Sequence, residues 1–141
     1  MASDRLRRDK VGKPRKVLFD SSFLIAVMEH PTSWEEDLLE KVGGFEGVII
    51  LPIYAELVSL ADRRERESGF ARLALELVDM GRIVLENAGG GQPDDELVSY
   101  ALSHDALVAT VDEALIEQLE AARVGIIRLR GGRVQFDAAV A

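Results

Sequence analysis

Two kinds of segment alternate along the chain. Short apolar runs, rich in β-branched residues, have the length and composition of buried strands. Five such runs span residues 16–19, 47–51, 82–85, 106–110 and 125–129. Strands of this kind, separated by helical segments, predict a parallel sheet covered by helices on both faces, because parallel neighbours need crossover connections.

The segments between these runs carry apolar residues at the spacing of amphipathic helices. The spacing predicts helices over residues 22–29, 34–42, 53–80, 93–103 and 113–123, with a break in the longest near Ser68 and Gly69. Gly131 and Gly132 divide the last apolar stretch, so a hairpin is predicted over residues 127–136. We therefore expect a three-layer α/β/α domain over residues 16–137, with a central parallel sheet of about five strands.

Acidic residues recur where the predicted strands end. Asp20 follows the first strand, Glu56 lies early in the helix after the second, and Asp112 follows the fourth. Asp94 and Asp95 open the fourth helix. In a parallel sheet these positions share the edge at which open α/β sheets bind ligands. The four aspartates are also suited to capping helices, whereas Glu56 stands inside an apolar helix.

Several carboxylates at one edge repel one another unless a cation offsets their charge. Two like charges about 4 Å apart repel by roughly 1 kcal/mol in water and by about 4 kcal/mol at an effective dielectric of 20. Ligand sets made only of oxygen favour Mg²⁺ or Mn²⁺ over zinc, and the chain has no cysteine. Such a metal activates water and neutralises charge on a phosphoryl group. The pattern therefore predicts metal-dependent hydrolysis of a phosphodiester.

The order of these residues resembles that of the PIN domain family. Four family motifs are matched, in order and within residues 16–130, by Asp20-Ser21-Ser22-Phe23-Leu24, Glu56-Leu57, Asp95-Glu96-Leu97-Val98 and residues 106–112. Leu97 and Val98 follow Asp95 at the family's spacing, which favours Asp95 over Asp94 without excluding the latter. Val111 departs from the pattern, because a polar residue often stands there in the family.

The resemblance implies a metal-dependent ribonuclease with a three-layer PIN-like fold. Its catalytic carboxylates would be Asp20, Glu56, Asp95 and Asp112. The three aspartates, Asp20, Asp95 and Asp112, would hold Mg²⁺ or Mn²⁺. Ser21 and Thr110 would donate hydrogen bonds to these acids and orient them.

The charge of the chain is unevenly distributed. Its net charge is −8, yet seven of its 17 Lys and Arg residues lie within residues 1–16. Residues 1–15 are predicted to form a basic, flexible arm, and the alternative is an ordinary frayed terminus. Contacts with RNA phosphates are expected from Arg5, Arg7, Arg8, Lys10, Lys13, Arg15 and Lys16.

The sequence restricts the biological role less than it restricts the fold and the chemistry. With no apolar run long enough to cross a bilayer, a cytoplasmic protein that meets no membrane is expected. RNA is the expected partner, and the helical region 53–80 is expected to pair two copies in a homodimer. The basic arm favours processing of ribosomal RNA. The alternatives are the toxin of a toxin–antitoxin pair, which would bind an antitoxin, and a catalytically silent scaffold that binds RNA or protein.

Overall fold

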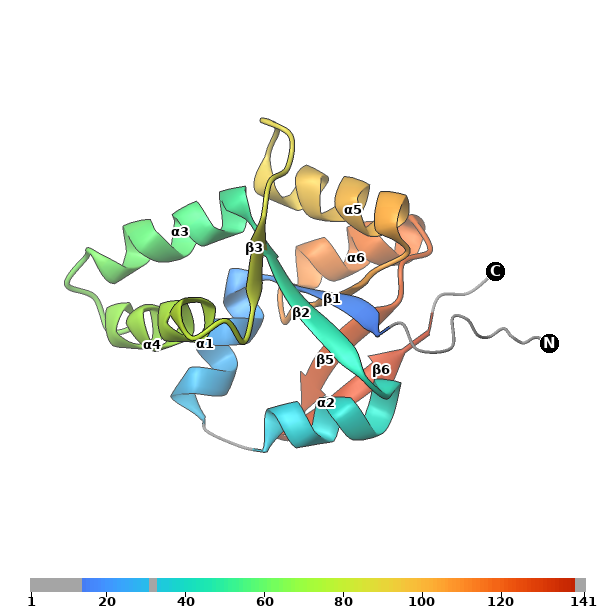
Figure 1. Ribbon diagram of the computed structural model, residues 1–141, viewed down its shortest axis with the longest axis horizontal. Helices are drawn as coiled ribbons and strands as arrows, with labels where there is room; N and C mark the ends of the chain where they lie inside the picture. The colour runs from blue at the N-terminus through green and yellow to red at the C-terminus, as the bar shows by residue number, and fades with distance from the viewer. Residues whose placement is uncertain (1–13, 31–32, 139–141) are drawn as a thin grey trace.

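A six-stranded sheet forms the centre of the protein (Figure 1). The computed structural model describes residues 14–30 and 33–138. The strands are β1 (Arg15–Phe19), β2 (Phe45–Ile50), β3 (Val84–Glu86), β4 (Leu107–Ala109), β5 (Ile126–Arg130) and β6 (Arg133–Asp137). Their spatial order is β3-β2-β1-β4-β5-β6, and every neighbouring pair is parallel except β5 and β6. The predicted parallel sheet is confirmed, and the predicted hairpin adds an antiparallel edge strand.

Helices cover both faces of the sheet. They are α1 (Ser21–Glu29), α2 (Trp34–Val42), α3 (Leu51–Ala61), α4 (Ser68–Asp79), α5 (Pro93–His104) and α6 (Glu113–Ala121). In Figure 1, α5 and α6 lie on the upper right of the strands, while α2 lies below them and α1 and α4 lie to their left. The predicted three layers are therefore present. Within the described residues, no helix has the length and apolar character that crossing a membrane requires.

Most element boundaries lie one or two residues from the predicted ones, and two of the differences have a clear physical cause. Leu51, expected to end a strand, begins α3 instead, because Pro52 fits the first helical turn, where an amide hydrogen has no partner to lose. The helix predicted over residues 53–80 is divided by residues 62–67 rather than near Gly69. Ser68 is buried at the start of α4, and its hydroxyl accepts a hydrogen bond from the Glu65 amide at 3.1 Å.

Aromatic packing joins the start of the chain to α1 and α2. The ring of Phe19 lies 5.7 Å from that of Phe23 and 5.6 Å from that of Trp34, the latter edge-on. All three side chains are buried. Because Asp20 directly follows Phe19, this cluster fixes the end of β1 from which the candidate site begins.

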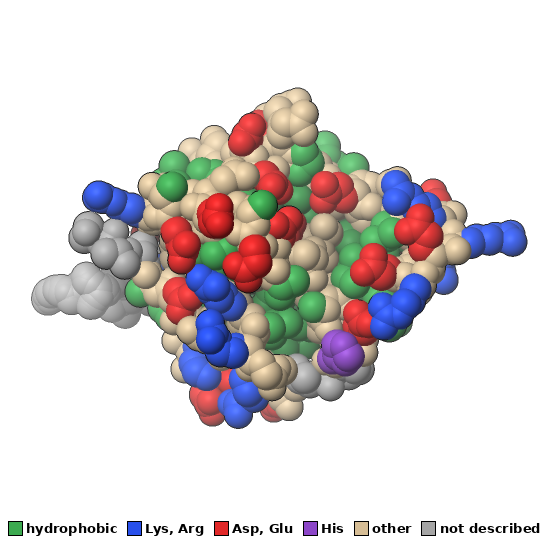
Figure 2. Space-filling model, turned by 180° about the vertical axis from the view of Figure 1, so that it is seen from behind, with side chains coloured by type: hydrophobic (Ala, Val, Ile, Leu, Met, Phe, Trp, Pro, Cys, Tyr) green, Lys and Arg blue, Asp and Glu red, His purple; other side chains and the backbone are tan. Residues whose placement is uncertain are grey.

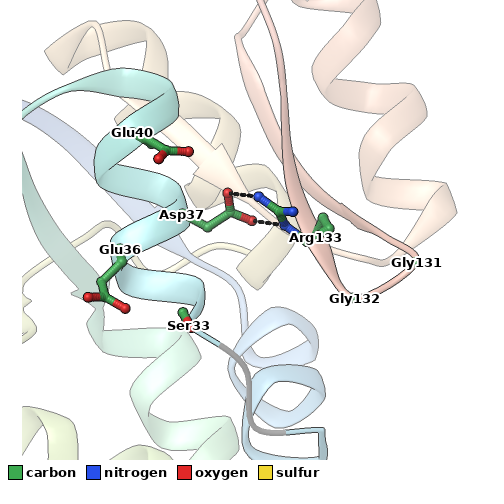
Figure 3. Close-up of a pocket in the computed structure, with 7 residues that line it drawn as sticks. All are labelled: Ser33, Glu36, Asp37, Glu40, Gly131, Gly132 and Arg133. Carbon is green, nitrogen blue, oxygen red and sulfur yellow. Dashed lines mark hydrogen bonds and ion pairs between the residues drawn. The ribbon is translucent and has the colours of Figure 1, made fainter.

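A buried carboxylate attaches the β5–β6 hairpin to α2. Asp37 accepts two hydrogen bonds from the Arg133 guanidinium, both at 3.0 Å, and one from the Val134 amide at 2.8 Å (Figure 3). These bonds hold the pKa of Asp37 well below its usual range, with Arg133 as the largest cause. The hairpin is thereby held at a defined position beside the strand ends.

Candidate active site

Asp20 is the most enclosed acid at the carboxyl edge of the sheet. It follows β1 and is only 5% exposed. Its backbone amide donates to the carbonyl oxygen of Ala109 on β4 at 2.9 Å, which sets Asp20 beside the end of that strand. Asp20 is the N-cap residue of α1 by position, but within the described chain its side chain makes no capping bond. Helix capping therefore does not explain this carboxylate.

Two hydroxyl groups hold the Asp20 carboxylate. Oδ2 accepts from Ser22 Oγ at 2.6 Å and from Thr110 Oγ1 at 2.8 Å, and Thr110 is fully buried. Thr110 Oγ1 also accepts from the Asp112 amide at 3.1 Å, and Ser22 Oγ accepts from the Val111 amide at 3.2 Å. The network joins the start of α1 to the loop after β4. A buried carboxylate with such donors is fixed in orientation before any ligand binds.

Ser22 is a site residue that the sequence did not single out. The resemblance assigned the orienting role to Ser21 and Thr110, and Thr110 does donate to Asp20. Ser21 instead donates to Glu56 Oε1 at 3.2 Å. A second serine, two positions after Asp20 and directly before the apolar residues of α1, was the available signal.

Glu56 extends from α3 toward the same edge. Desolvation by the surrounding protein is the largest cause that raises its pKa, and the charges of Asp20 and Asp94 raise it further, against the bond from Ser21. The negative charges on α3, on the end of β1 and on α5 are therefore within electrostatic reach of one another. The parallel sheet brings them together, since its strands end at this edge.

The start of α5 presents Asp94 to this group. Desolvation raises the pKa of Asp94, followed by the charges of Asp20, Asp112 and Asp95. Asp95 itself is exposed, whereas Asp94 is half-buried. The structure thus places Asp94 toward Asp20, while the spacing to Leu97 and Val98 favoured Asp95. The rotation of α5 about its axis decides between neighbouring residues, and packing rather than spacing sets it.

Asp112 has a capping role as well as a place at the edge. Its Oδ1 accepts from the amides of Ala114 at 2.9 Å and Leu115 at 3.3 Å, so it caps α6. This is the behaviour expected of an aspartate at a helix start. Its charge nevertheless contributes to the raised pKa of Asp94, so the cap lies within the acidic edge.

The acids approach one another without forming a closed ligand shell. Among residues 14–30 and 33–138, no three acidic or histidine side chains are grouped closely enough to hold a metal ion. The donor chemistry nevertheless fits a hard cation, because all the converging groups are carboxylates. Asp20 is fixed by its hydroxyl donors, while Glu56 and Asp112 are exposed.

The predicted basic contacts fall into two groups. Arg15 and Lys16 belong to β1. The strand thus begins one residue before residue 16, the expected start of the domain. Lys16 Nζ lies 3.7 Å from a carboxylate oxygen of Glu86 and donates to the Tyr100 hydroxyl at 3.3 Å. The remaining five, which lie outside the described residues, are Arg5, Arg7, Arg8, Lys10 and Lys13.

Fold and site together define an α/β domain with a mostly parallel sheet and carboxylates at the strand ends. A family model described as "PIN like domain" matches residues 17–132. The chain belongs to this PIN-like domain family, which confirms the resemblance inferred from its motifs.

Solved structures share the fold. The PIN domain endonuclease Utp24 superposes with a TM-score of 0.72 at 20% identity, over 91% of this chain and 97% of that one. Nuclear protein-only RNase P 2 from Arabidopsis thaliana superposes with a TM-score of 0.50 at 12% identity, over 96% of this chain and 32% of that one. None of the curated proteins matches the sequence. At these identities the structural likeness shows the fold alone.

Proposed function

We propose that the protein is an endoribonuclease that uses Mg²⁺ or Mn²⁺ to hydrolyse RNA phosphodiester bonds. The observation that carries this proposal is the position of Asp20, Glu56, Asp94 and Asp112 at one edge. Desolvation contributes most to the raised pKa values of Glu56 and Asp94, and the charges of the neighbouring aspartates raise both further. Mutual repulsion of this kind destabilises a fold unless a bound cation offsets it. The arrangement therefore favours a metal site over a set of independent helix caps.

Each residue has a distinct place in this proposal. Asp20, Asp94 and Asp112 would hold the metal, with Asp94 in place of the Asp95 that the motif spacing favoured. When bound, the metal would lower the pKa of water and neutralise charge on the phosphoryl group. Thr110 and Ser22 hold Asp20 in place by the hydrogen bonds described above.

Glu56 is proposed to act as the general base. Its raised pKa brings it nearer to neutral pH than an ordinary glutamate, so it is suited to accept a proton from the attacking water. Ser21 donates to Oε1 and orients the carboxyl group. Glu56→Gln keeps the shape and removes the basic oxygen. It should lower the cleavage rate of a fluorescent single-stranded RNA in Mn²⁺ by about 10²–10⁴-fold.

A matched control on α6 tests whether the loss of one surface charge by itself lowers the cleavage rate. Glu117 is exposed and acidic like Glu56, so Glu117→Gln removes one charge without touching the strand ends. This variant should cleave RNA at the parent rate. Equal rates for Glu56→Gln and the parent would exclude Glu56 from the reaction. If the parent cleaved no RNA in Mn²⁺, the proposed activity itself would be wrong.

RNA is the proposed substrate because the two similar structures are named as an endonuclease and an RNase P. The cluster of Lys and Arg residues within residues 1–16 supports this choice, since the rest of the chain is acidic. We propose a role in processing structured precursor RNA, such as ribosomal RNA. A toxin should instead arrest growth when expressed, and Asp20→Asn should relieve the arrest. Growth at the normal rate with active protein favours processing.

A further inference from the structure

An apolar hollow lies beside the candidate active site. Figure 2 shows it as a patch of hydrophobic side chains below a group of acidic ones. The hollow has a volume of about 450 Å³. It is lined by Ala26 and Val27 of α1, by His30 directly after that helix, by Val111, and by Leu129 and Gly132 of the hairpin. Its walls therefore come from three segments that are distant in sequence.

Val111 connects this hollow to the acids. Its side chain is 36% exposed although it is apolar, and it directly precedes Asp112. Its amide donates to Ser22 Oγ at 3.2 Å, and Ser22 donates to the Asp20 carboxylate at 2.6 Å. The wall of the hollow is thus fixed to the same network that fixes Asp20. This is also the position at which the chain departs from the family pattern.

Two arginines of the hairpin, Arg130 and Arg133, are sequence neighbours of residues that line the hollow. Arg130 is exposed between two residues that line it, Leu129 and Gly132. The guanidinium of Arg133 is held by Asp37, as Figure 3 shows, yet 70% of its side chain is exposed. Lys41, Arg130 and Arg133 also border a second cavity of about 440 Å³. Figure 2 shows Lys and Arg side chains gathered beside the apolar patch.

We propose that the hollow receives an unstacked base of single-stranded RNA while Arg130 binds a phosphate beyond it. This inference rests on the nuclease function proposed above. Val111 of the hollow directly precedes Asp112 of the acidic edge, and Leu129 of the hollow directly precedes Arg130. A strand would therefore place one phosphate at a metal, the next base on Val111 and a further phosphate at Arg130. A base within a duplex is stacked and paired, so it cannot enter the hollow.

Charge disfavours a second copy of the chain as the occupant. The net charge of the chain is −8, and the hollow adjoins its acidic edge, so a second copy would bring like charges together. RNA also carries negative charge, but Arg130 offers a partner to its phosphates, whereas Arg133 is paired with Asp37 and shares a cavity with Glu36 and Glu40. The alternation of apolar and basic surface therefore fits a polynucleotide better than another acidic protein.

The test measures RNA binding without cleavage. Fluorescence anisotropy with a labelled single-stranded RNA, and with the same RNA in a duplex, is recorded in Mg²⁺ on an Asp20→Asn background. Adding Val111→Asn should weaken binding of the single strand by about fivefold, because a partly buried apolar contact is lost. Binding of the duplex should change little. Val111→Thr keeps the branched shape and one methyl group, so its affinity for the single strand should lie between those of Val111→Asn and the background protein.

Control variants distinguish the hollow from general surface effects. Leu102→Asn removes an exposed apolar side chain from α5, outside the hollow, and should bind RNA like the background protein. Arg130→Gln should lower the slope of affinity against salt by about 0.7, the value for one phosphate contact on a single strand. Arg123→Gln, at the other end of β5, should leave the slope unchanged. Melting temperatures confirm that every variant is folded.

Two results would overturn the proposal. One is a Val111→Asn variant that binds the single strand as tightly as the background protein. The other is light scattering in which Val111→Asn turns a dimer into a monomer while RNA affinity stays the same, which would make the hollow an interface between copies. Failure of the parent protein to cleave RNA would contradict the proposed function but would leave these binding results interpretable.

Discussion

Replacement of Thr110 by valine tests whether the Thr110 hydroxyl orients Asp20, because the packing of the core is left unchanged. Thr110 is fully buried, and its hydroxyl donates to Asp20 Oδ2 at 2.8 Å. The same oxygen accepts from the Asp112 amide at 3.1 Å. Thr110→Val keeps the branched shape and removes only the hydroxyl. Asp20 then retains its bond from Ser22 but loses its second donor.

The cost follows from these two bonds. A hydrogen bond to a charged group contributes about 1.5–3 kcal/mol, and the bond to the Asp112 amide about 1 kcal/mol. We therefore expect Thr110→Val to lower the free energy of unfolding by about 2.5–4 kcal/mol. For a domain of 141 residues this lowers Tm by about 8–12 °C, at roughly 3 °C per kcal/mol. Loss of an orienting bond should also weaken Mn²⁺ binding by about 10–100-fold.

Urea unfolding and calorimetric titration with Mn²⁺ measure the two effects. Thr110→Ser is the matched control, because it keeps the hydroxyl and loses one methyl group, at a cost of about 0.8 kcal/mol. Its Mn²⁺ affinity should stay near that of the parent protein. A double-mutant cycle of Thr110→Val with Asp20→Asn should show coupling between the two side chains. If Thr110→Val unfolds and binds Mn²⁺ like Thr110→Ser, the orienting role of Thr110 is wrong.

Three further predictions concern stability and RNA binding. Because the folded state lowers the pKa of Asp37, its stabilisation is complete above the ordinary carboxyl pKa of about 3.9 and is lost as pH falls toward the folded value. Urea unfolding between pH 7 and pH 3 should therefore depend less on pH in Asp37→Asn, and an unchanged dependence would contradict the assignment. Gly47→Ala should cost about 1–3 kcal/mol in the same assay, because its new Cβ would lie 2.8 Å from a ring carbon of Phe19, whereas Gly44→Ala meets open space and should be near neutral. Deleting residues 1–13 should keep the fold, weaken RNA binding and flatten its salt dependence, and equal salt slopes would show that the arm does not contact RNA.

The centre of the sheet was predictable because strands such as β2 and β4 are buried on both faces. Continuous apolar runs such as 47–51 have no polar face to present, and only a strand covered by helices on both sides satisfies them. The ends were less predictable. Leu51 is as apolar as the residues before it, so only the geometry of the following Pro52 marks where β2 stops. Boundaries of this kind depend on backbone packing that composition does not record.

The candidate site was predictable in outline for the same reason. Once the strands are parallel, acids at their ends must share an edge. The rotation of α5 was not predictable, because Asp94 and Asp95 are chemically equal and only packing against the sheet turns one of them inward. The apolar hollow was not predictable from the sequence either. It depends on Val111 and Leu129 meeting across a distance of 18 positions in the sequence, which no local pattern encodes.

The most direct test of the account compares Mn²⁺-dependent cleavage of single-stranded RNA by three variants, Asp20→Asn, Asp94→Asn and Asp95→Asn. Asparagine caps a helix about as well as aspartate, so a capping role alone predicts no loss of activity. We expect Asp20→Asn and Asp94→Asn to lose activity by orders of magnitude. The metal-free Tm of Asp94→Asn should hold or rise, because repulsion is relieved. Asp95→Asn should remain active. Full metal-dependent activity in both Asp20→Asn and Asp94→Asn would contradict the proposed carboxylate site.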